Sequence, residues 1–162
     1  MSKIPDIKEA VVMPFEEKVT WVNAVVSAIV PAAYFAVVLS QLGNVSASEI
    51  AYQRPMLTAI GVSIVLTILG SIAMGIGTGI SAELAQRGSA GDIGRKDERD
   101  VYIGRRGELA GYYVSSVGVV GAMALTMLQY EYFWIANALY LSFAVAALVS
   151  ATVKLVAYRR GF

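Results

Sequence analysis

The 162-residue sequence contains no cysteine and no histidine. Without cysteine, the chain has no disulfide bonds and no thiol redox chemistry. Without either residue, it has none of the usual zinc sites and no haem with histidine or cysteine ligands. A proton relay through histidine is also excluded. These absences remove thiol oxidoreductases and membrane cytochromes from consideration, and we expect no cofactor.

Charge is missing from four long stretches: residues 19–48, 55–82, 109–130 and 132–153 contain no Asp, Glu, Lys or Arg. About 20 apolar residues in a helix cross the roughly 30 Å hydrocarbon core of a bilayer. Hydrophobic residues make up 57% of the chain and its mean hydropathy is +0.62, which is high for a water-soluble domain.

The sequence therefore predicts an all-α membrane protein with four transmembrane helices in one domain over residues 1–162. The predicted spans are about 19–42, 55–82, 107–129 and 132–157. Because the first stretch is longer than the apolar part of a signal peptide, about 7 to 15 residues, we expect it to be retained as an anchor.

The basic residues are distributed unevenly. Twelve of the 13 lie before the first span, between the second and third, or at the C-terminal end, whereas Arg54 lies between the first and second. Positive residues favour the cytoplasmic side of a membrane. The pattern predicts a multi-pass protein of the cytoplasmic (plasma) membrane, with both termini and the charged connector 83–106 in the cytoplasm. The short connection 129–132 makes the last two spans antiparallel neighbours, so the four helices form two antiparallel hairpins.

The third helix is predicted to begin before its apolar part. Asp97 as the N-cap, with Asp100 three residues later, resembles a capping box, and acidic residues suit the positive end of a helix dipole. Nothing then interrupts the helix before Gln129. Its length would be about 50 Å at 1.5 Å per residue, so about three turns should extend into the cytoplasm. We call this extension the stalk.

Small residues recur on two of the predicted helices, at four-residue spacing on the second span and less regularly on the third. A ridge of small side chains lets another helix backbone approach closely, which is how helices associate in lipid. The ridge residues are Ala59, Ser63, Thr67, Ser71, Gly75 and Gly79 on the second span, and Gly107, Gly111 and Ser115 on the third. We expect the two faces to meet, within one chain or across a homo-oligomer, with a dimer favoured. The alternative is that they line a pathway.

The polar side chains expected at membrane depth, such as Asn23 and Asn137, do not ionise near neutral pH. Ion-coupled transporters and pumps need a carboxylate or a cation within the membrane. Small four-helix multidrug exporters depend on such a glutamate, and the four charge-free stretches contain none. We therefore expect Asn23 and Asn137 to form hydrogen bonds between helices.

The segment 83–108 is the most highly charged part of the chain, with six acidic and six basic residues. We expect a salt-bridge network there that joins the cytoplasmic helix ends. The alternative is that its carboxylates collect oxygen ligands for a divalent cation. Arg105 and Arg106 are expected to contact anionic lipid headgroups. The predicted network comprises Glu83, Arg95, Asp97, Glu98, Arg99, Asp100, Arg105, Arg106 and Glu108.

The run Lys96-Asp97-Glu98-Arg99-Asp100, followed by Ile103 and a glycine-rich span from Gly107, resembles a group of small prokaryotic four-helix membrane proteins of unknown function. Members of that group also have a Lys-Asp-Glu-Arg segment before a transmembrane helix. The resemblance covers about residues 91–156. It implies a prokaryotic inner-membrane protein, and it implies a cytoplasmic partner because some members are encoded near small helix-turn-helix regulators. It brings no catalytic residues to this chain.

No motif in the chain indicates a reaction. Our first hypothesis is a non-enzymatic membrane accessory protein that oligomerises through its small-residue faces and presents the charged stalk to a partner. The alternative is a passive transporter or channel for an uncharged or lipid-like molecule. An enzyme using Asp97 and Asp100 comes third, because no nucleophile has a base beside it. The near-neutral net charge of +1 argues against direct nucleic-acid binding.

Overall fold

The computed structural model describes residues 13–84 and 98–160. They form four long α-helices and two short 3₁₀ turns: α1 (Phe15–Leu39), η1 (Ser40–Gly43), η2 (Ala47–Glu49), α2 (Gln53–Leu84), α3 (Glu98–Met127) and α4 (Tyr132–Arg160). Each α-helix is long and apolar enough to cross a membrane. The predicted all-α fold with four membrane-length helices is confirmed.

The residues at the helix ends explain where the helices begin and stop. Pro14 precedes α1, where its missing N–H leaves no hydrogen bond unmade, and Glu16 and Glu17 lie in the first turn beside the positive end of the helix dipole. At the other end of the chain, α4 finishes on Arg159 and Arg160, whose charge suits the negative end of its dipole. The predicted N-cap of the third helix, Asp97, lies outside the described residues.

The connection between α3 and α4 is a compact turn. Gln129 has a φ of 57°, in the left-handed region, and the Tyr130 N–H donates to the Leu125 carbonyl at 3.0 Å. This bond and the left-handed residue are the features of a Schellman helix end. α3 therefore stops at Met127, just before the predicted end at Gln129, and α4 returns directly alongside it.

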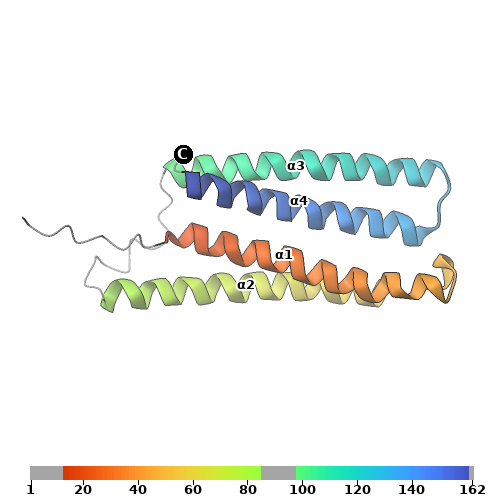
Figure 1. The fold of residues 1–162 in the computed structure, drawn as a ribbon, viewed down its shortest axis with the longest axis horizontal. Helices are drawn as coiled ribbons and strands as arrows, with labels where there is room; N and C mark the ends of the chain where they lie inside the picture. The colour runs from red at the N-terminus through yellow and green to blue at the C-terminus, as the bar shows by residue number, and fades with distance from the viewer. Residues whose placement is uncertain (1–12, 85–97, 161–162) are drawn as a thin grey trace, which may run out of the picture.

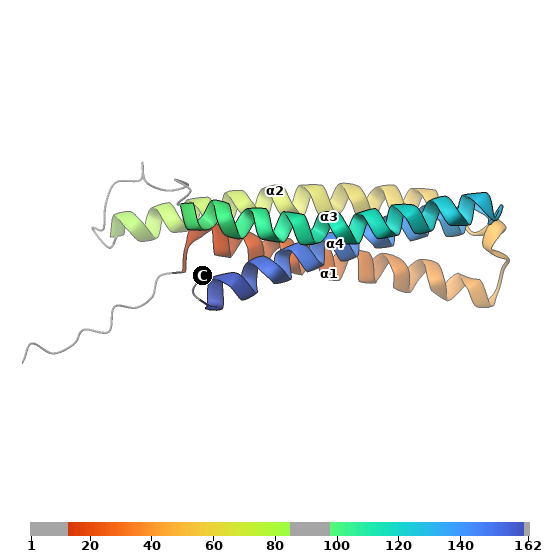
Figure 2. The same cartoon turned by 90° about the horizontal axis from the view of Figure 1, so that it is seen from above.

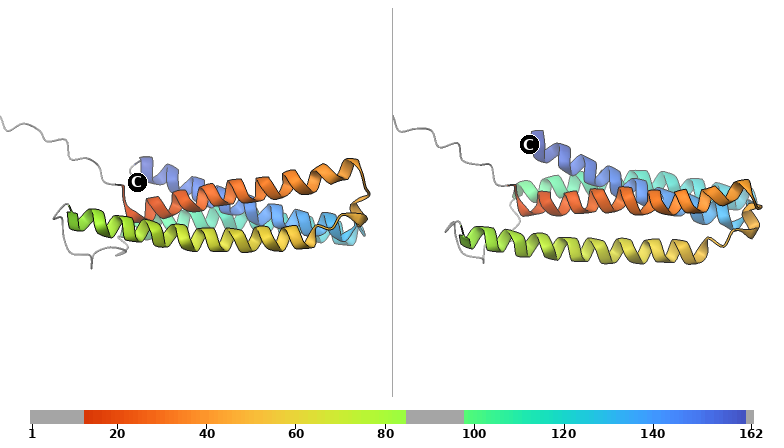
Figure 3. Two further views of the ribbon diagram at one scale, coloured as in Figure 1. Left: turned by 90° about the horizontal axis from the view of Figure 1, so that it is seen from below. Right: turned by 60° about the horizontal axis from the view of Figure 1, so that its bottom comes forward.

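The helices lie side by side in the order α3, α4, α1, α2 (Figure 1). α3 packs along α4, and α1 packs against both α4 and α2. The view from above in Figure 2 and the view from below in Figure 3 (left) place α2 and α3 on the same side of α1, so the row is bent. Within the described residues, the outer helices α2 and α3 make no extensive contact with each other.

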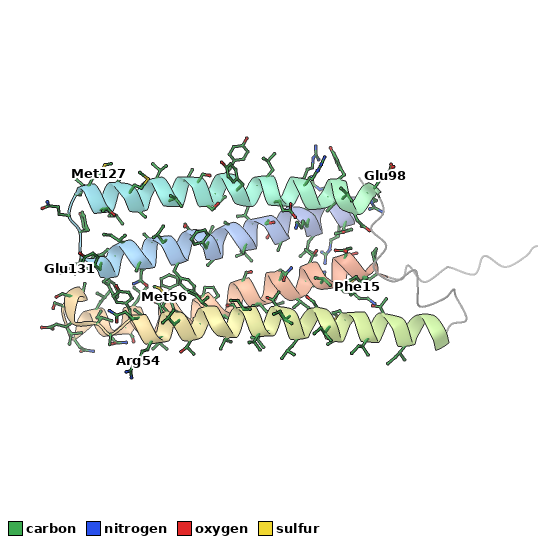
Figure 4. The ribbon with its side chains drawn as sticks, turned by 180° about the vertical axis from the view of Figure 1, so that it is seen from behind. Phe15, Arg54, Met56, Glu98, Met127 and Glu131 are labelled. Carbon is green, nitrogen blue, oxygen red and sulfur yellow. The ribbon has the colours of Figure 1, made fainter. Side chains whose placement is uncertain are left out.

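The two ends of the bundle differ in composition. Phe15 and Glu98, which begin α1 and α3, lie at one end, and Met127 and Glu131 lie at the other (Figure 4). We call the first end, where α2 and α4 finish, the charged end. The second end holds the α1–α2 loop and the α3–α4 turn, and we call it the turn end.

A cluster of well-buried apolar side chains lies toward the turn end. Val38 and Phe133 are 0% and 1% exposed, and Tyr34, Ile50 and Ala59 complete their cluster. These residues come from α1, the loop, α2 and α4, so this cluster, the turn-end core, joins three helices. It closes the space between α1, α2 and α4 at that end.

Candidate functional site: a polar crevice between three helices

The small residues of α3 pack against α4 of the same chain. Gly107 and Gly111 are buried. A Cβ atom on Gly111 would lie 3.0 Å from the Ala146 carbonyl oxygen, and one on Gly107 would lie 2.8 Å from the Ser150 carbonyl oxygen. Ser115 is half-buried and donates to the Tyr112 carbonyl of its own helix. The sequence predicts that this face meets the second span, within one chain or across a homo-oligomer. Within the single chain it packs on α4 instead, because the tight α3–α4 turn brings α4 onto it.

On α2, which is otherwise mostly exposed, the ridge residue Ala59 is buried and the ridge residues that follow it are half-buried: Ser63, Thr67, Ser71, Gly75 and Gly79. A Cβ atom on Gly75 would meet the Phe15 ring of α1 at 3.7 Å. Ser63 and Thr67 line cavities together with residues of α1 and α4. The ridge therefore lies on the side of α2 that faces the rest of the bundle.

Two adjoining cavities form a crevice between α1, α2 and α4. The outer cavity, of about 280 Å³, lies nearer the charged end and is lined by Asn23, Ser27, Thr67, Ser150 and Lys154, among others. The inner cavity, of about 330 Å³, reaches Ser63 and Tyr140. Ser27, Thr67 and Ala147 line both cavities, so the crevice is continuous.

The hydroxyl groups in this crevice are unusual for the chain. Most described serine and threonine hydroxyls donate to a carbonyl in the preceding turn, as Thr58 does to Arg54 and Thr152 does to Leu148. One crevice hydroxyl, that of Thr20, does the same with Glu16. Such a bond satisfies the hydroxyl without any outside partner. Five described serine and threonine side chains have no hydrogen bond to another described residue: Ser27, Ser63, Thr67, Ser71 and Ser150. Four of the five line the crevice.

Two further polar groups in the crevice lack partners among the described residues. The Tyr140 hydroxyl is buried without a hydrogen bond, and the Asn23 amide has none either. By contrast, the buried Tyr34 hydroxyl donates to Asn137 Oδ1 at 2.8 Å, and Asn137 Nδ2 donates to the Phe133 carbonyl. Unpaired polar groups are costly at membrane depth, at about 1–3 kcal/mol each by mutational measures. Water or the polar part of a ligand would satisfy the crevice groups.

The crevice has one closed end and one charged end. Toward the turn end, the Tyr140 ring packs edge-on against Tyr34 of the turn-end core, with ring centroids 4.9 Å apart. Toward the charged end, Lys154 lines the outer cavity, and its Nζ lies 3.6 Å from Glu108 Oε1. The Lys154 side chain is 24% exposed, whereas that of Glu108 is 73% exposed. Among the described residues, Lys154 is the one cationic side chain that lines the crevice, and it is only partly in solvent.

The described members of the predicted charged network link α3 to α4. Arg99 Nη2 donates to the Tyr158 carbonyl at 3.4 Å, and the Tyr158 hydroxyl donates to Asp100 Oδ1 at 2.9 Å. These bonds hold the first turns of α3 against the last turns of α4, so that part of the stalk is not free-standing. The Arg106 guanidinium lies 5.0 Å from the centre of the Tyr102 ring.

Of the other members of that set, some are exposed and some cannot be described. Glu98 and Arg105 are exposed. Arg95 and Asp97, and the side chain of Glu83, lie outside the described part. Among the described residues, no three carboxylates are gathered as ligands for a metal ion.

Sequence reasoning missed most of the crevice. Ser27 and Ser150 were not singled out, Tyr140 is one of nine tyrosines, and Lys154 reads as part of the positive C-terminal end. One signal was available: Asn23 and Ser27 are one turn apart in an apolar helix, which is a polar line along one face. That line becomes a site only when α2 and α4 lie beside it.

Comparison of the chain with protein-family models, curated proteins and solved structures finds no match. The resemblance to small prokaryotic membrane proteins stays a prediction. The described part of its motif, Glu98–Asp100, forms the first turn of α3, and Ile103 is buried one turn later.

Proposed function

We propose that this protein binds a lipid-like molecule, through its polar groups, in the crevice between α1, α2 and α4. The observation that supports this most is that four of the five serine and threonine hydroxyls without a partner among the described residues line one crevice. Packing alone does not need these hydroxyls, because alanine would allow the same approach of two helices. A bound molecule would supply the missing hydrogen bonds.

Binding is better supported than an open channel. A channel needs a continuous path between the two faces of the membrane, and the turn-end core lies across that path with Val38 and Phe133 fully buried. The Tyr34–Asn137 hydrogen bond further ties α1 to α4 there. Passage of a molecule would require these groups to separate, so passive transport is secondary to binding in this proposal.

Filling the crevice tests the proposal. Thr67 lines both cavities, so Thr67→Leu should expel the ligand, whereas Thr152→Leu is the matched control, since Thr152 is exposed and bonded to its own helix. Each full-length protein would be extracted gently from its own membrane and its bound small molecules measured by native mass spectrometry. We expect wild type and the control to carry a molecule that Thr67→Leu lacks. Equal ligand content in all three, with unchanged helix content by circular dichroism, would refute the proposal.

A second candidate is an interaction protein of the cytoplasmic membrane that presents its charged end to a cytoplasmic partner and assembles as a homo-oligomer. It is favoured by the exposed charges at the start of α3, among them Glu98, Arg105 and Glu108. In this arrangement both termini face the cytoplasm, and Arg105 and Arg106 contact anionic lipid headgroups. Replacing both arginines by alanine should weaken residence and assembly in anionic liposomes. Unchanged behaviour would contradict the role of this pair.

A further inference from the structure

We propose that the ligand of the crevice is an anionic phospholipid, and that Lys154 binds its phosphate in place of Glu108. This inference rests on the crevice being a ligand site, as proposed above. It adds the chemical class of the ligand and a role for the Lys154–Glu108 pair.

Lys154 is the cationic group at the outer end of the crevice. Its stem lies over Gly107, since a Cβ atom there would be 2.6 Å from Lys154 Cε. The side chain is therefore held along α3 and not free in solvent. Its ion pair with Glu108 is long, at 3.6 Å, and the carboxylate is 73% exposed. Such exposed pairs contribute little, typically below about 1 kcal/mol, so a phosphate can replace the carboxylate.

The lining of the crevice changes along its length in the way that a lipid changes from headgroup to chain. The outer cavity is lined by Lys154 together with the neutral hydrogen-bonding residues Asn23, Ser27 and Ser150. Ser150 is about one helical turn, roughly 5 Å, from Lys154, which suits the spacing of a phosphate and its glycerol oxygens. The inner cavity combines apolar walls such as Ile64 and Phe143 with the Ser63 and Tyr140 hydroxyls. It therefore suits the ester groups and the first part of the acyl chains. A free anion would leave that inner part unfilled.

The helix order gives such a lipid a lateral route. α2 and α4 form opposite walls of the crevice, and each packs extensively on α1 but not on the other. The side between them therefore faces the hydrocarbon region of the bilayer. A phospholipid can enter from its own leaflet with its headgroup at the charged end.

The test is a titration of the delipidated full-length protein, in a neutral detergent, with dioleoylphosphatidylglycerol or dioleoylphosphatidylcholine. The two lipids have the same chains, and the second has no net charge. Lipid-bound and free protein are counted by native mass spectrometry. We expect the anionic lipid to bind about tenfold more tightly than the neutral one, as a charge-assisted hydrogen bond would give. Equal binding would overturn the inference.

Substitutions then test whether the preference for the anionic lipid depends on Lys154. Lys154→Met should lower binding of the anionic lipid to the level of the neutral one, and Lys154→Arg should keep the preference. Glu108→Gln removes the competing carboxylate and should tighten anionic binding by about two- to fivefold, a gain that a misfolded protein cannot give. Lys18→Met is the matched control, because Lys18 bonds Thr78 outside the crevice. A preference lost equally in Lys18→Met, or kept in Lys154→Met, would overturn the role of Lys154.

Two further measurements are needed. One distinguishes a lipid phosphate from free phosphate, and the other distinguishes failure of this inference from failure of the crevice proposal. Inorganic phosphate at millimolar concentration should not displace the anionic lipid; displacement would mark a free-anion site and overturn the lipid assignment. Thr67→Leu should weaken both lipids alike. If Thr67→Leu weakens both but Lys154→Met leaves their ratio unchanged, this inference fails while the crevice remains a ligand site. If Thr67→Leu has no effect on either lipid, the crevice proposal itself fails.

Discussion

Close packing of α3 on α4 predicts opposite effects for the same substitution at two neighbouring glycines. A Cβ atom on Gly118 would overlap the Ser142 side chain of α4 and lie 3.3 Å from the Ser142 Cα. Gly121 lies one turn further along α3, and a Cβ atom there would meet nothing within 4 Å. Gly121→Ala is therefore the matched control for Gly118→Ala.

The expected magnitudes follow from two terms. Alanine exceeds glycine in helix propensity by about 1 kcal/mol, and this gain is similar at the two positions. At Gly118 the methyl group must displace the Ser142 backbone, because a serine Cβ cannot swing away as a long side chain does. Overpacking of this kind costs about 1–3 kcal/mol. We expect Gly121→Ala to be neutral or up to about 1 kcal/mol more stable than wild type, and Gly118→Ala to be about 1–3 kcal/mol less stable than Gly121→Ala.

The free energies can be measured by unfolding in mixed micelles with an increasing mole fraction of SDS, followed by far-UV circular dichroism. Trp134, near the start of α4, gives a second signal by fluorescence. Agreement of the two signals supports two-state unfolding, which the comparison of free energies requires.

The difference in unfolding free energy between the two variants reports on the contact between α3 and α4, because the gain in helix propensity is similar at both positions and cancels. A difference below about 0.5 kcal/mol would mean that α3 and α4 are not in close contact at Gly118. The helix pairing described above would then be wrong. A large loss at both positions would show that the outer side of α3 is also packed, for example against a second copy of the chain.

Four other substitutions test separate features. Tyr34→Phe removes the buried hydrogen bond to the amide oxygen on α4 and should lower stability by about 0.6–1.7 kcal/mol in the same unfolding assay, so an unchanged value would contradict that bond. Gln129→Gly relieves a left-handed backbone and should raise stability by about 1 kcal/mol, whereas a loss would mean that the turn differs. Ser46→Cys and Glu98→Cys, each the only thiol in its protein, should be labelled by an impermeant reagent from opposite faces of the membrane, and labelling from one face would refute the proposed orientation. Ser63→Ala should leave stability unchanged or raised but lower ligand content in native mass spectrometry, and full ligand content would count against its role.

The helices themselves could be predicted from local properties of the chain. The second predicted span, 55–82, differs from α2 (Gln53–Leu84) by two residues at each end, because charge placement and apolar length are read directly from the sequence. The acidic residues in the first described turn of α3, Glu98 and Asp100, are also a local property, since such charges act on a helix start within one turn.

The pairing of the helices could not be predicted in the same way. Gly107 and Gly111 were recognised as packing residues, but a small residue does not specify which helix comes to it. The choice of α4 depends on the turn at Gln129 and on the fit to Ala146 and Ser150, which is a property of two segments together. The crevice depends on three segments, and for that reason Tyr140 and Lys154 were missed as members of a site.

The serine and threonine residues of α2 show why the ridge had two readings in the sequence. Small size allows close approach to another helix, and for that purpose alanine and glycine serve as well as serine and threonine. The ridge is glycine at positions 75 and 79, where Gly75 meets Phe15 of α1, and it carries hydroxyls at Ser63 and Thr67, where a cavity adjoins it. Packing explains the first pair of residues. The second pair is left without hydrogen bonds to the described chain, so its hydroxyls are better explained by contact with a molecule that enters the crevice.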